Sequence, residues 1–327
     1  MSSKPLVLLG KEIPRGSSVL LDLEVAKLHT RTTVKVPVIV NRAKKSGPVV
    51  LLLAGLHGDE VNGVAIIREI IAQKINKPTK GTIICIPVFN IFGYLIQTRE
   101  FPDGRDLNRV FPGSPNGSLA SQFAYQFIEN IAPFVDYVID FHTGGGDKEN
   151  MAQIRCHENE VETMKLAEIF NPPYIIHSDY IAKSLRETLN KMSKTVLLFE
   201  GGKSKNFDPK IISHGVRGTK NILTHLGLID GAIEKTVEPI HLKKTKWLRA
   251  PFSGMFKLNV KNGTFVKKKE VLAVILDPFG DFKKKVYAPF DGHIFCINKT
   301  PIVNKGDALF HISNAVSYTH LTLPTIY

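Results

Sequence analysis

Three side chains that favour divalent metal ions follow two apolar runs of the sequence. Residues 51–63 read LLLAGLHGDEVNG, so His57 and Glu60 come directly after a run of apolar residues. His142 stands in DFHTGGG, at the end of a second apolar run. Two imidazoles and one carboxylate leave a fourth tetrahedral position open for water, as a catalytic zinc requires. Cobalt and manganese can be bound by the same three ligands. His-x-x-Glu alone also occurs in an ordinary strand-to-helix turn that binds no metal.

An arginine-rich loop is the second candidate feature. The segment QTREFPDGRDLNRVFPG, bounded by glycine and proline, contains Arg99, Arg105, Asp106, Asn108 and Arg109. Arginine and asparagine together can bind a substrate carboxylate through charge-assisted hydrogen bonds. A second arginine can stabilise a developing oxyanion. The alternative is a solvated loop held by salt bridges.

Glu200 closes the apolar run TVLLFEGGK and is the candidate general base. Burial disfavours an ionised carboxylate and raises its pKa toward the range that suits proton transfer near neutral pH. The alternative is a glutamate at a strand end that simply faces water.

The elements that must position these residues alternate between apolar strands and amphipathic helices. Strands are expected at residues 47–55, 81–88, 135–142 and 194–202, and helices at 64–75, 118–132 and 158–170. This alternation is typical of an α/β sheet covered by helices on both faces. Ligands bind such sheets at the carboxyl ends of the strands. His57, His142 and Glu200 each fall at such an end, so we expect them to meet.

The sequence pattern changes after about residue 240, where short strand-like runs, glycine-containing turns and many lysines follow. APFSGMFKLNVKNGTFVKKKEVLAVI (250–275) aligns with APFDGHIFCINKTPIVNKGDALFHI (288–312), an internal repeat. Neither hairpin unit can bury its apolar face alone, so the pair predicts a small all-β barrel or sandwich. The predicted organisation is a catalytic domain at 1–240, a β-domain at 241–313, and a non-native or disordered tail at 314–327. His320, in that tail, is not treated as a ligand.

This C-terminal half resembles the barrel-sandwich module of biotinyl and lipoyl carrier domains. Carriers bear their modified lysine on a tight turn, in a Met-Lys-Met or Asp-Lys-Ala setting. The corresponding connection here, DPFGDFKKKVY, has neither setting around Lys283, Lys284 or Lys285. A structural or oligomer-forming role is therefore the expectation, and a homo-oligomer stays open.

Composition and charge limit the classes of partner. The net charge is +13, and residues 243–307 hold 14 Lys and Arg against five Asp and Glu. Interleaved aromatics and nucleic-acid-reading motifs are missing from the sequence, so a solvated lysine-rich surface is expected and no nucleic-acid partner. No apolar run approaches the roughly 18 to 20 residues that span a bilayer, so no membrane partner is expected either.

The cysteines and the N-terminus indicate a cytoplasmic protein. Cys85, Cys156 and Cys296 are far apart and form no CxxC motif, which suits a reducing compartment. The first residues, MSSKPLVLLGKEIPRGSS, contain a short apolar core and no small-residue cleavage pattern, unlike a signal peptide.

Taken together, the motifs resemble one family. HGDE with Asn62-Gly63, Asn90-x-x-Gly93, DLNRVFPG, DFHTGG and FEGG are similar to motifs of the succinylglutamate desuccinylase/aspartoacylase family over about residues 35–312. Its members are zinc-dependent amidohydrolases on a carboxypeptidase-A-like α/β fold. The resemblance therefore implies a carboxypeptidase-like mixed sheet flanked by helices, with one zinc ion per chain.

The resemblance also implies roles for individual residues. His57, Glu60 and His142 match the zinc ligands, and Glu200 matches the catalytic glutamate. Asp106 is placed like an acid that orients a zinc-bound imidazole.

Further roles concern the substrate. Asn108 and Arg109 match the pair that holds its carboxylate, and Arg99 matches the arginine that polarises the scissile carbonyl, with Arg105 as the alternative. Arg155, in AQIRCH, is the candidate for reading the acyl group. The family's substrate-binding tyrosine has three candidates: Tyr174, Tyr180 and Tyr287.

These residues predict zinc-dependent hydrolysis of the amide bond in a small N-acyl amino acid or related N-acylated compound. In the expected reaction Glu200 takes a proton from a zinc-activated water, and Arg99 helps to polarise the amide carbonyl. A metallocarboxypeptidase acting on peptides is the alternative enzyme. A carrier or binding protein is the alternative of another class.

Overall fold

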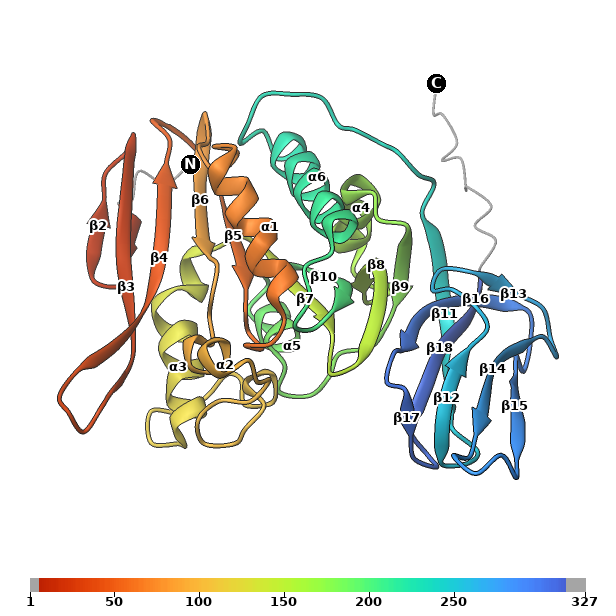
Figure 1. Cartoon of the computed structure of the whole chain (residues 1–327). Helices are drawn as coiled ribbons and strands as arrows, with labels where there is room; N and C mark the ends of the chain where they lie inside the picture. Colours follow the sequence, from red (N-terminus) through yellow and green to blue (C-terminus); the bar gives the residue numbers. More distant parts are fainter. Residues whose placement is uncertain (1–5, 316–327) are drawn as a thin grey trace, which may run out of the picture.

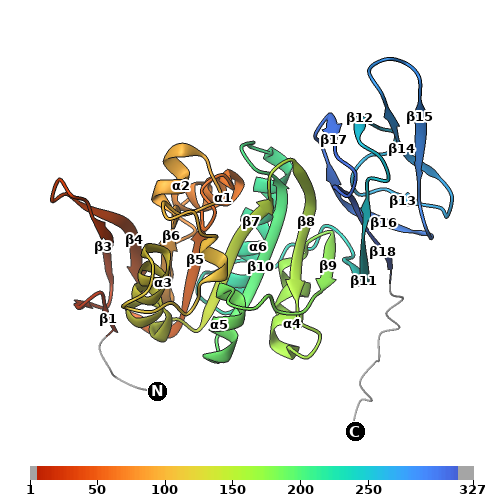
Figure 2. The same cartoon turned by 90° about the horizontal axis from the view of Figure 1, so that it is seen from below.

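The computed structural model describes residues 6–315, and a 12-stranded mixed β-sheet runs through it (Figures 1 and 2). The central strands are β3 (Ser17–Lys27), β4 (Thr33–Arg42), β5 (Lys45–Ala54), β6 (Lys80–Ile86), β7 (Tyr137–Gly144), β8 (Lys148–Cys156), β9 (Tyr174–His177) and β10 (Thr195–Lys203). Their order is β3-β4-β6-β5-β7-β10-β8-β9. Strands β6, β5, β7 and β10 are parallel to one another, whereas β4 and β8 run antiparallel beside them. The predicted mixed α/β fold is confirmed.

Helices cover both faces of this sheet. They are α1 (Val61–Ala72), α2 (Ile91–Ile96), α3 (Leu119–Asn130), α4 (Val161–Phe170), α5 (Leu185–Lys191) and α6 (Pro209–His225), with 3-10 turns at Leu107–Arg109 and Ala132–Phe134. Successive residues of β5 point to opposite faces: Leu51 belongs to the same apolar core as Phe123 of α3, and Val50 to the same core as Ile66 of α1. Two apolar cores, one on each face, follow from this alternation. Among the described residues, no helix combines the length and the apolar character that a bilayer-spanning segment needs.

The N-terminal residues form an edge of the fold. A small hairpin of β1 (Leu6–Leu8) and β2 (Lys11–Ile13) is a separate two-stranded sheet, and β3 lies at the end of the large sheet (Figure 1). None of these strands was expected from the sequence.

The C-terminal residues form a second body of strands at the other end of the molecule (Figure 1). They are β11 (Ile240–Arg249), β12 (Gly254–Leu258), β13 (Phe265–Val266), β14 (Val271–Leu276), β15 (Lys283–Tyr287), β16 (Gly292–Asn298), β17 (Ile302–Val303) and β18 (Ala308–Ala315). The sheet β15-β14-β12-β17 and the strands β13, β16 and β18 enclose an apolar core of their own. The two copies of the repeat interlock, because the short strand of each copy, β13 or β17, pairs with the first strand of the other.

The two bodies share one sheet. Strand β11 is parallel to β9, and β16 is antiparallel to β8, with Cys296 opposite Asn150. The domain boundary near residue 240 stays a prediction. Of the predicted tail, residues 314 and 315 belong to β18, and residues 316–327, with His320, lie outside the described residues.

Candidate metal centre and substrate cavity

The first candidate ligands lie between β5 and α1, in a loop that only a tight backbone can form. Gly58 packs against α2 so closely that an added Cβ atom would lie 1.9 Å from the carbonyl carbon of Gly93. Asn90 caps the N-terminus of α2, and its side chain accepts a hydrogen bond from the Gly93 amide at 2.9 Å. The close contact of Gly58 with α2 fixes the loop that carries His57, and Glu60 is the N-cap residue of α1.

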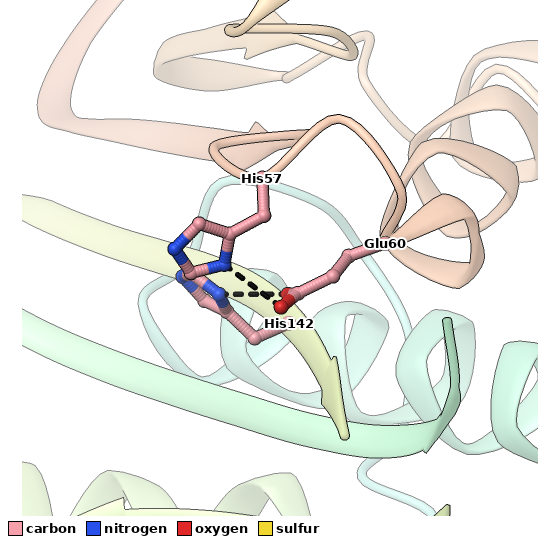
Figure 3. Close-up of side chains that lie close together, drawn as sticks. All are labelled: His57, Glu60 and His142. Carbon is pink, nitrogen blue, oxygen red and sulfur yellow. Dashed lines mark hydrogen bonds and ion pairs between the residues drawn. The ribbon is translucent and has the colours of Figure 1, made fainter. Parts of the chain in front are cut away.

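His57, Glu60 and His142 converge around one point (Figure 3). His57 Nδ1 lies 2.8 Å from Glu60 Oε1, and His142 Nδ1 lies 2.9 Å from Glu60 Oε2. One possible ligand atom from each residue lies within 4.8 Å of the others, and all three side chains are buried. Two imidazole nitrogens and a carboxylate directed at one point are a donor set that fits zinc.

The outer nitrogen of each imidazole is paired with a carboxylate. His57 Nε2 donates to Asp106 Oδ1 at 3.1 Å, and His142 Nε2 donates to Asp140 Oδ2 at 2.9 Å. Such pairs fix the ring so that the Nδ1 lone pair points at a metal ion. The interaction expected for Asp106 is therefore present. Asp140 was missed, although Asp-x-His within a strand puts both side chains on one face.

Asp140→Asn is expected to weaken zinc binding by roughly 10- to 100-fold, because the amide cannot hold the imidazole as the carboxylate does. Competition with a chromogenic chelator measures this change. Asp22→Asn, at an exposed position on β3 paired with Lys35, is the control and should leave the affinity unchanged. Wild-type affinity in Asp140→Asn would exclude this role for Asp140.

Charge coupling within the centre sets the protonation of the ligands. Burial alone would raise the pKa of Glu60, but the imidazoles of His57 and His142 hold it well below its usual value. Burial alone would lower the pKa of His142, but Asp140 and Glu60 raise it well above the ordinary value. Glu60 and Asp140 thus stabilise the charged form of His142, and a metal ion bound at Nδ1 would compete with the proton there.

The arginine loop contributes one guanidinium directly beside the ligands. Arg99 donates to Asp106 Oδ2 through Nε at 3.1 Å and Nη2 at 2.9 Å, and its Nη1 lies 3.2 Å from Glu60 Oε1. Arg105 instead pairs with Asp103 at 3.3 Å, on the exposed surface, and does not line the cavity. The geometry therefore favours Arg99 over Arg105 as the cation next to the metal ligands.

Asn108 and Arg109 also lie at the cavity. The Asn108 side-chain oxygen accepts from the Leu185 amide at 2.8 Å, and its backbone amide donates to Asp106 Oδ1 at 2.8 Å. Arg109 is exposed, and its Nη1 donates to the Asn108 carbonyl at 2.7 Å. The side-chain amide of Asn108 is thus fixed in place, whereas the Arg109 guanidinium borders the opening.

Glu200 lies beside His142, in register on the adjacent strands β10 and β7. Its Oε2 accepts a hydrogen bond from Asn150 Nδ2 at 2.7 Å, and its Oε1 lies 3.5 Å from Arg155 Nε. Asn150 and Arg155 thus contact the candidate base, which lines the same cavity as the metal ligands. Arg155, on β8, is brought to the site as expected, although its near partner is Glu200.

One cavity of about 300 Å³, open to solvent on one side, is lined by these groups. Its wall also includes Arg186, which sequence patterns did not single out, and Trp247 and Cys296 from the C-terminal strands. Arg186 is buried and donates to the carbonyls of Arg155, Ser178 and Asp179. A small cavity with several guanidinium groups suits an anionic small molecule.

None of the three candidate tyrosines lines this cavity, although all three are among the described residues. The Tyr174 hydroxyl donates to the Gly263 carbonyl at 3.1 Å, and the Tyr180 hydroxyl donates to Glu160. Tyr287 is exposed on β15. The aromatic side chain on the cavity wall is that of Trp247.

The chain is similar to a family of known proteins. Residues 46–226, more than half of the chain, match the model of the succinylglutamate desuccinylase/aspartoacylase catalytic domain. An N-alpha-acetyl-L-2,4-diaminobutyric acid deacetylase from Halomonas elongata is 28% identical over an alignment of 297 positions that covers 86% of each chain.

Two solved structures share the fold. A succinylglutamate desuccinylase/aspartoacylase from Rhodobacter sphaeroides has a TM-score of 0.81 and 24% identity, covering 93% of this chain and 98% of its own. The product-bound ectoine utilization protein EutE (DoeB) from Ruegeria pomeroyi has a TM-score of 0.82 and 23% identity, covering 96% and 100%. The likeness extends over the C-terminal strands as well as the central sheet.

Proposed function

The chain belongs to the succinylglutamate desuccinylase/aspartoacylase family, and from that premise we propose that it is a zinc-dependent hydrolase of small N-acyl amino acids or related N-acylated compounds. One observation carries the proposal: the metal-ligand set, Glu200 and several arginines line a single cavity of about 300 Å³. The proposal includes a carboxypeptidase-A-like arrangement of the central sheet, supported by its parallel block with antiparallel strands on both sides.

The residues of the chain divide the reaction between them. His57, Glu60 and His142 would hold the zinc ion, which would act as a Lewis acid and lower the pKa of water. Glu200 is the general base that takes the proton from the attacking water and returns it to the leaving amine. Arg99 stabilises the negative charge that develops on the amide oxygen.

The remaining polar and cationic side chains of the cavity are suited to binding the substrate. Asn108 and Arg109 are suited to a carboxylate on the amino-acid part, because an amide and a guanidinium both donate hydrogen bonds to it. Arg155 and Arg186 provide positive charge deeper in the wall. The cavity size supports a small substrate over a peptide, the ligand of the alternative carboxypeptidase.

A deacylation screen with the zinc-loaded protein tests the proposal. N-acetyl and N-succinyl amino acids are expected to release free amine, with kcat/KM at least about tenfold above that for short peptides, because a cavity of about 300 Å³ suits one amino acid with a small acyl group. Faster release of C-terminal residues from peptides would favour the carboxypeptidase instead. Hydrolysis of neither class would refute the enzyme proposal.

A further inference from the structure

Asn150 makes a close side-chain contact with the candidate base, and no sequence motif singled it out. It lies on β8, its side chain is buried, and its Nδ2 donates to Glu200 Oε2 at 2.7 Å. An ionised carboxylate only accepts hydrogen bonds, so the amide must present its NH2 group to Glu200. This contact therefore has a defined direction and acts on the charged form of the base.

Glu200 lies where the pairing of β10 with β7 and β8 changes register. Glu200 lies opposite Gln153 of β8, and after the shift Gly202 lies opposite Asn150. A glutamate side chain has three rotatable bonds and samples several orientations unless a partner selects one. Arg155 Nε, at 3.5 Å from Oε1, is an ion-pair neighbour at longer range.

Hydrogen bonds from the C-terminal strands and loops hold the start of β8, the strand that carries Asn150. Cys296 of β16 pairs with Asn150 across the sheet, and the Lys299 amide donates to the Asp147 carbonyl at 2.9 Å. The Asn262 side chain donates to the Glu149 carbonyl at 2.7 Å. The start of β8 is thus held between β10 and the C-terminal strands, which limits the positions open to Asn150.

We propose that Asn150 is a positioning residue for Glu200: its amide holds Oε2 and leaves Oε1 to exchange the proton during hydrolysis. The inference rests on the proposed function, because it assigns Glu200 the role of base. Through β16, the C-terminal body contributes to the same positioning.

Asn150→Ala in the full-length, zinc-loaded protein tests this role. Loss of a hydrogen bond to a charged group is expected to lower kcat by roughly 10- to 100-fold while KM stays within about threefold, because the base is affected and substrate binding is not. Zinc content and the circular dichroism spectrum of the folded protein are expected to match wild type. Asn298→Ala is the matched control, because this buried asparagine lies on β16 opposite Lys148 and bonds the Ala308 carbonyl.

A second variant and a double mutant separate positioning from packing. Asn150→Asp keeps the shape but lacks the NH2 group, so its kcat should fall at least as far as that of Asn150→Ala. In a Glu200→Gln background, Asn150→Ala should change the residual rate by less than about twofold, since residues that act as a unit are not additive.

Three results would overturn the positioning role in an active enzyme: wild-type kcat in Asn150→Ala, near-wild-type kcat in Asn150→Asp, or an undiminished loss in the Glu200→Gln background. Equal losses of kcat in Asn298→Ala and Asn150→Ala would also overturn it, because they would assign the effect to the pairing of β8 with β16 and not to the contact with Glu200. A wild-type protein without deacylase activity would instead refute the proposed function, so the two failures are distinguishable.

Discussion

Glu200→Gln is expected to lower kcat/KM by about 10²- to 10⁴-fold while zinc stays bound, the range attributed to a positioned general base. Glutamine keeps the shape of the side chain and can still accept the hydrogen bond from Asn150, but it cannot take a proton at neutral pH. The three converging ligand atoms do not include Glu200, so the metal centre remains complete. Steady-state kinetics and metal analysis on the same sample measure both quantities.

Glu187→Gln is the control for that experiment, since this glutamate of α5 pairs with Lys191 outside the cavity and should leave the rate unchanged. A near-wild-type rate in Glu200→Gln would remove Glu200 from the mechanism. Loss of zinc together with the rate would assign it to the metal centre instead.

His142→Asn is expected to lose both zinc and activity. The variant leaves two strong ligands, His57 and Glu60, where a catalytic zinc site uses three. Its loss of zinc affinity should exceed the roughly 10- to 100-fold expected for Asp140→Asn, which acts only through the ligand. Metal analysis after dialysis against a weak chelator and an activity assay measure the outcome.

Folding must be checked beside metal content, because removing one imidazole leaves Glu60 and Asp140 as buried charges with fewer partners. Circular dichroism shows whether the variant keeps its secondary structure. His157→Asn is the control, since this ring stacks on Tyr180 and does not line the cavity. Wild-type zinc content in folded His142→Asn would refute the ligand assignment.

The elements with long apolar runs were predictable from the sequence. Strands β5, β6, β7 and β10 and helices α1, α3 and α4 lie where the pattern indicated, within a few residues at their ends. Buried parallel strands are apolar on both faces, and this makes them distinct in a sequence. Strands β3 and β4 were missed, although β3 alternates between exposed and buried positions as an edge strand does.

Helix α6 was missed for a different reason. It contains Gly215 and Gly218, and glycine has a low helix propensity. An added Cβ atom at Gly218 would lie 2.2 Å from the Phe170 ring of α4, so close helix packing requires the small residue. Tertiary contact, which a local pattern does not encode, decides this element.

The site residues also fall into those that the sequence predicted and those that it did not. His57 and Glu60 follow β5, and His142 and Glu200 lie near the C-terminal ends of β7 and β10. The adjacency of these three strands brings the four side chains together. The groups around them were harder to predict. The contacts of Asn150 depend on the register of β8, and Trp247 reaches the cavity from a strand more than 40 residues after Glu200. None of the three tyrosine candidates lines the cavity, and no local pattern shows which aromatic residue reaches it.

The shared sheet also bears on how the C-terminal body could move. A prosthetic arm that shuttles between catalytic stations must be free to travel on a flexible tether. Here the hydrogen-bond ladders of β11 with β9 and β16 with β8 would have to break before any such excursion. Lys283, Lys284 and Lys285 lie within β15, paired with β14, and not on the tip of a turn. The C-terminal body is therefore a fixed part of the cavity wall, to which it contributes Trp247 and Cys296. This arrangement argues against a carrier domain that moves between sites.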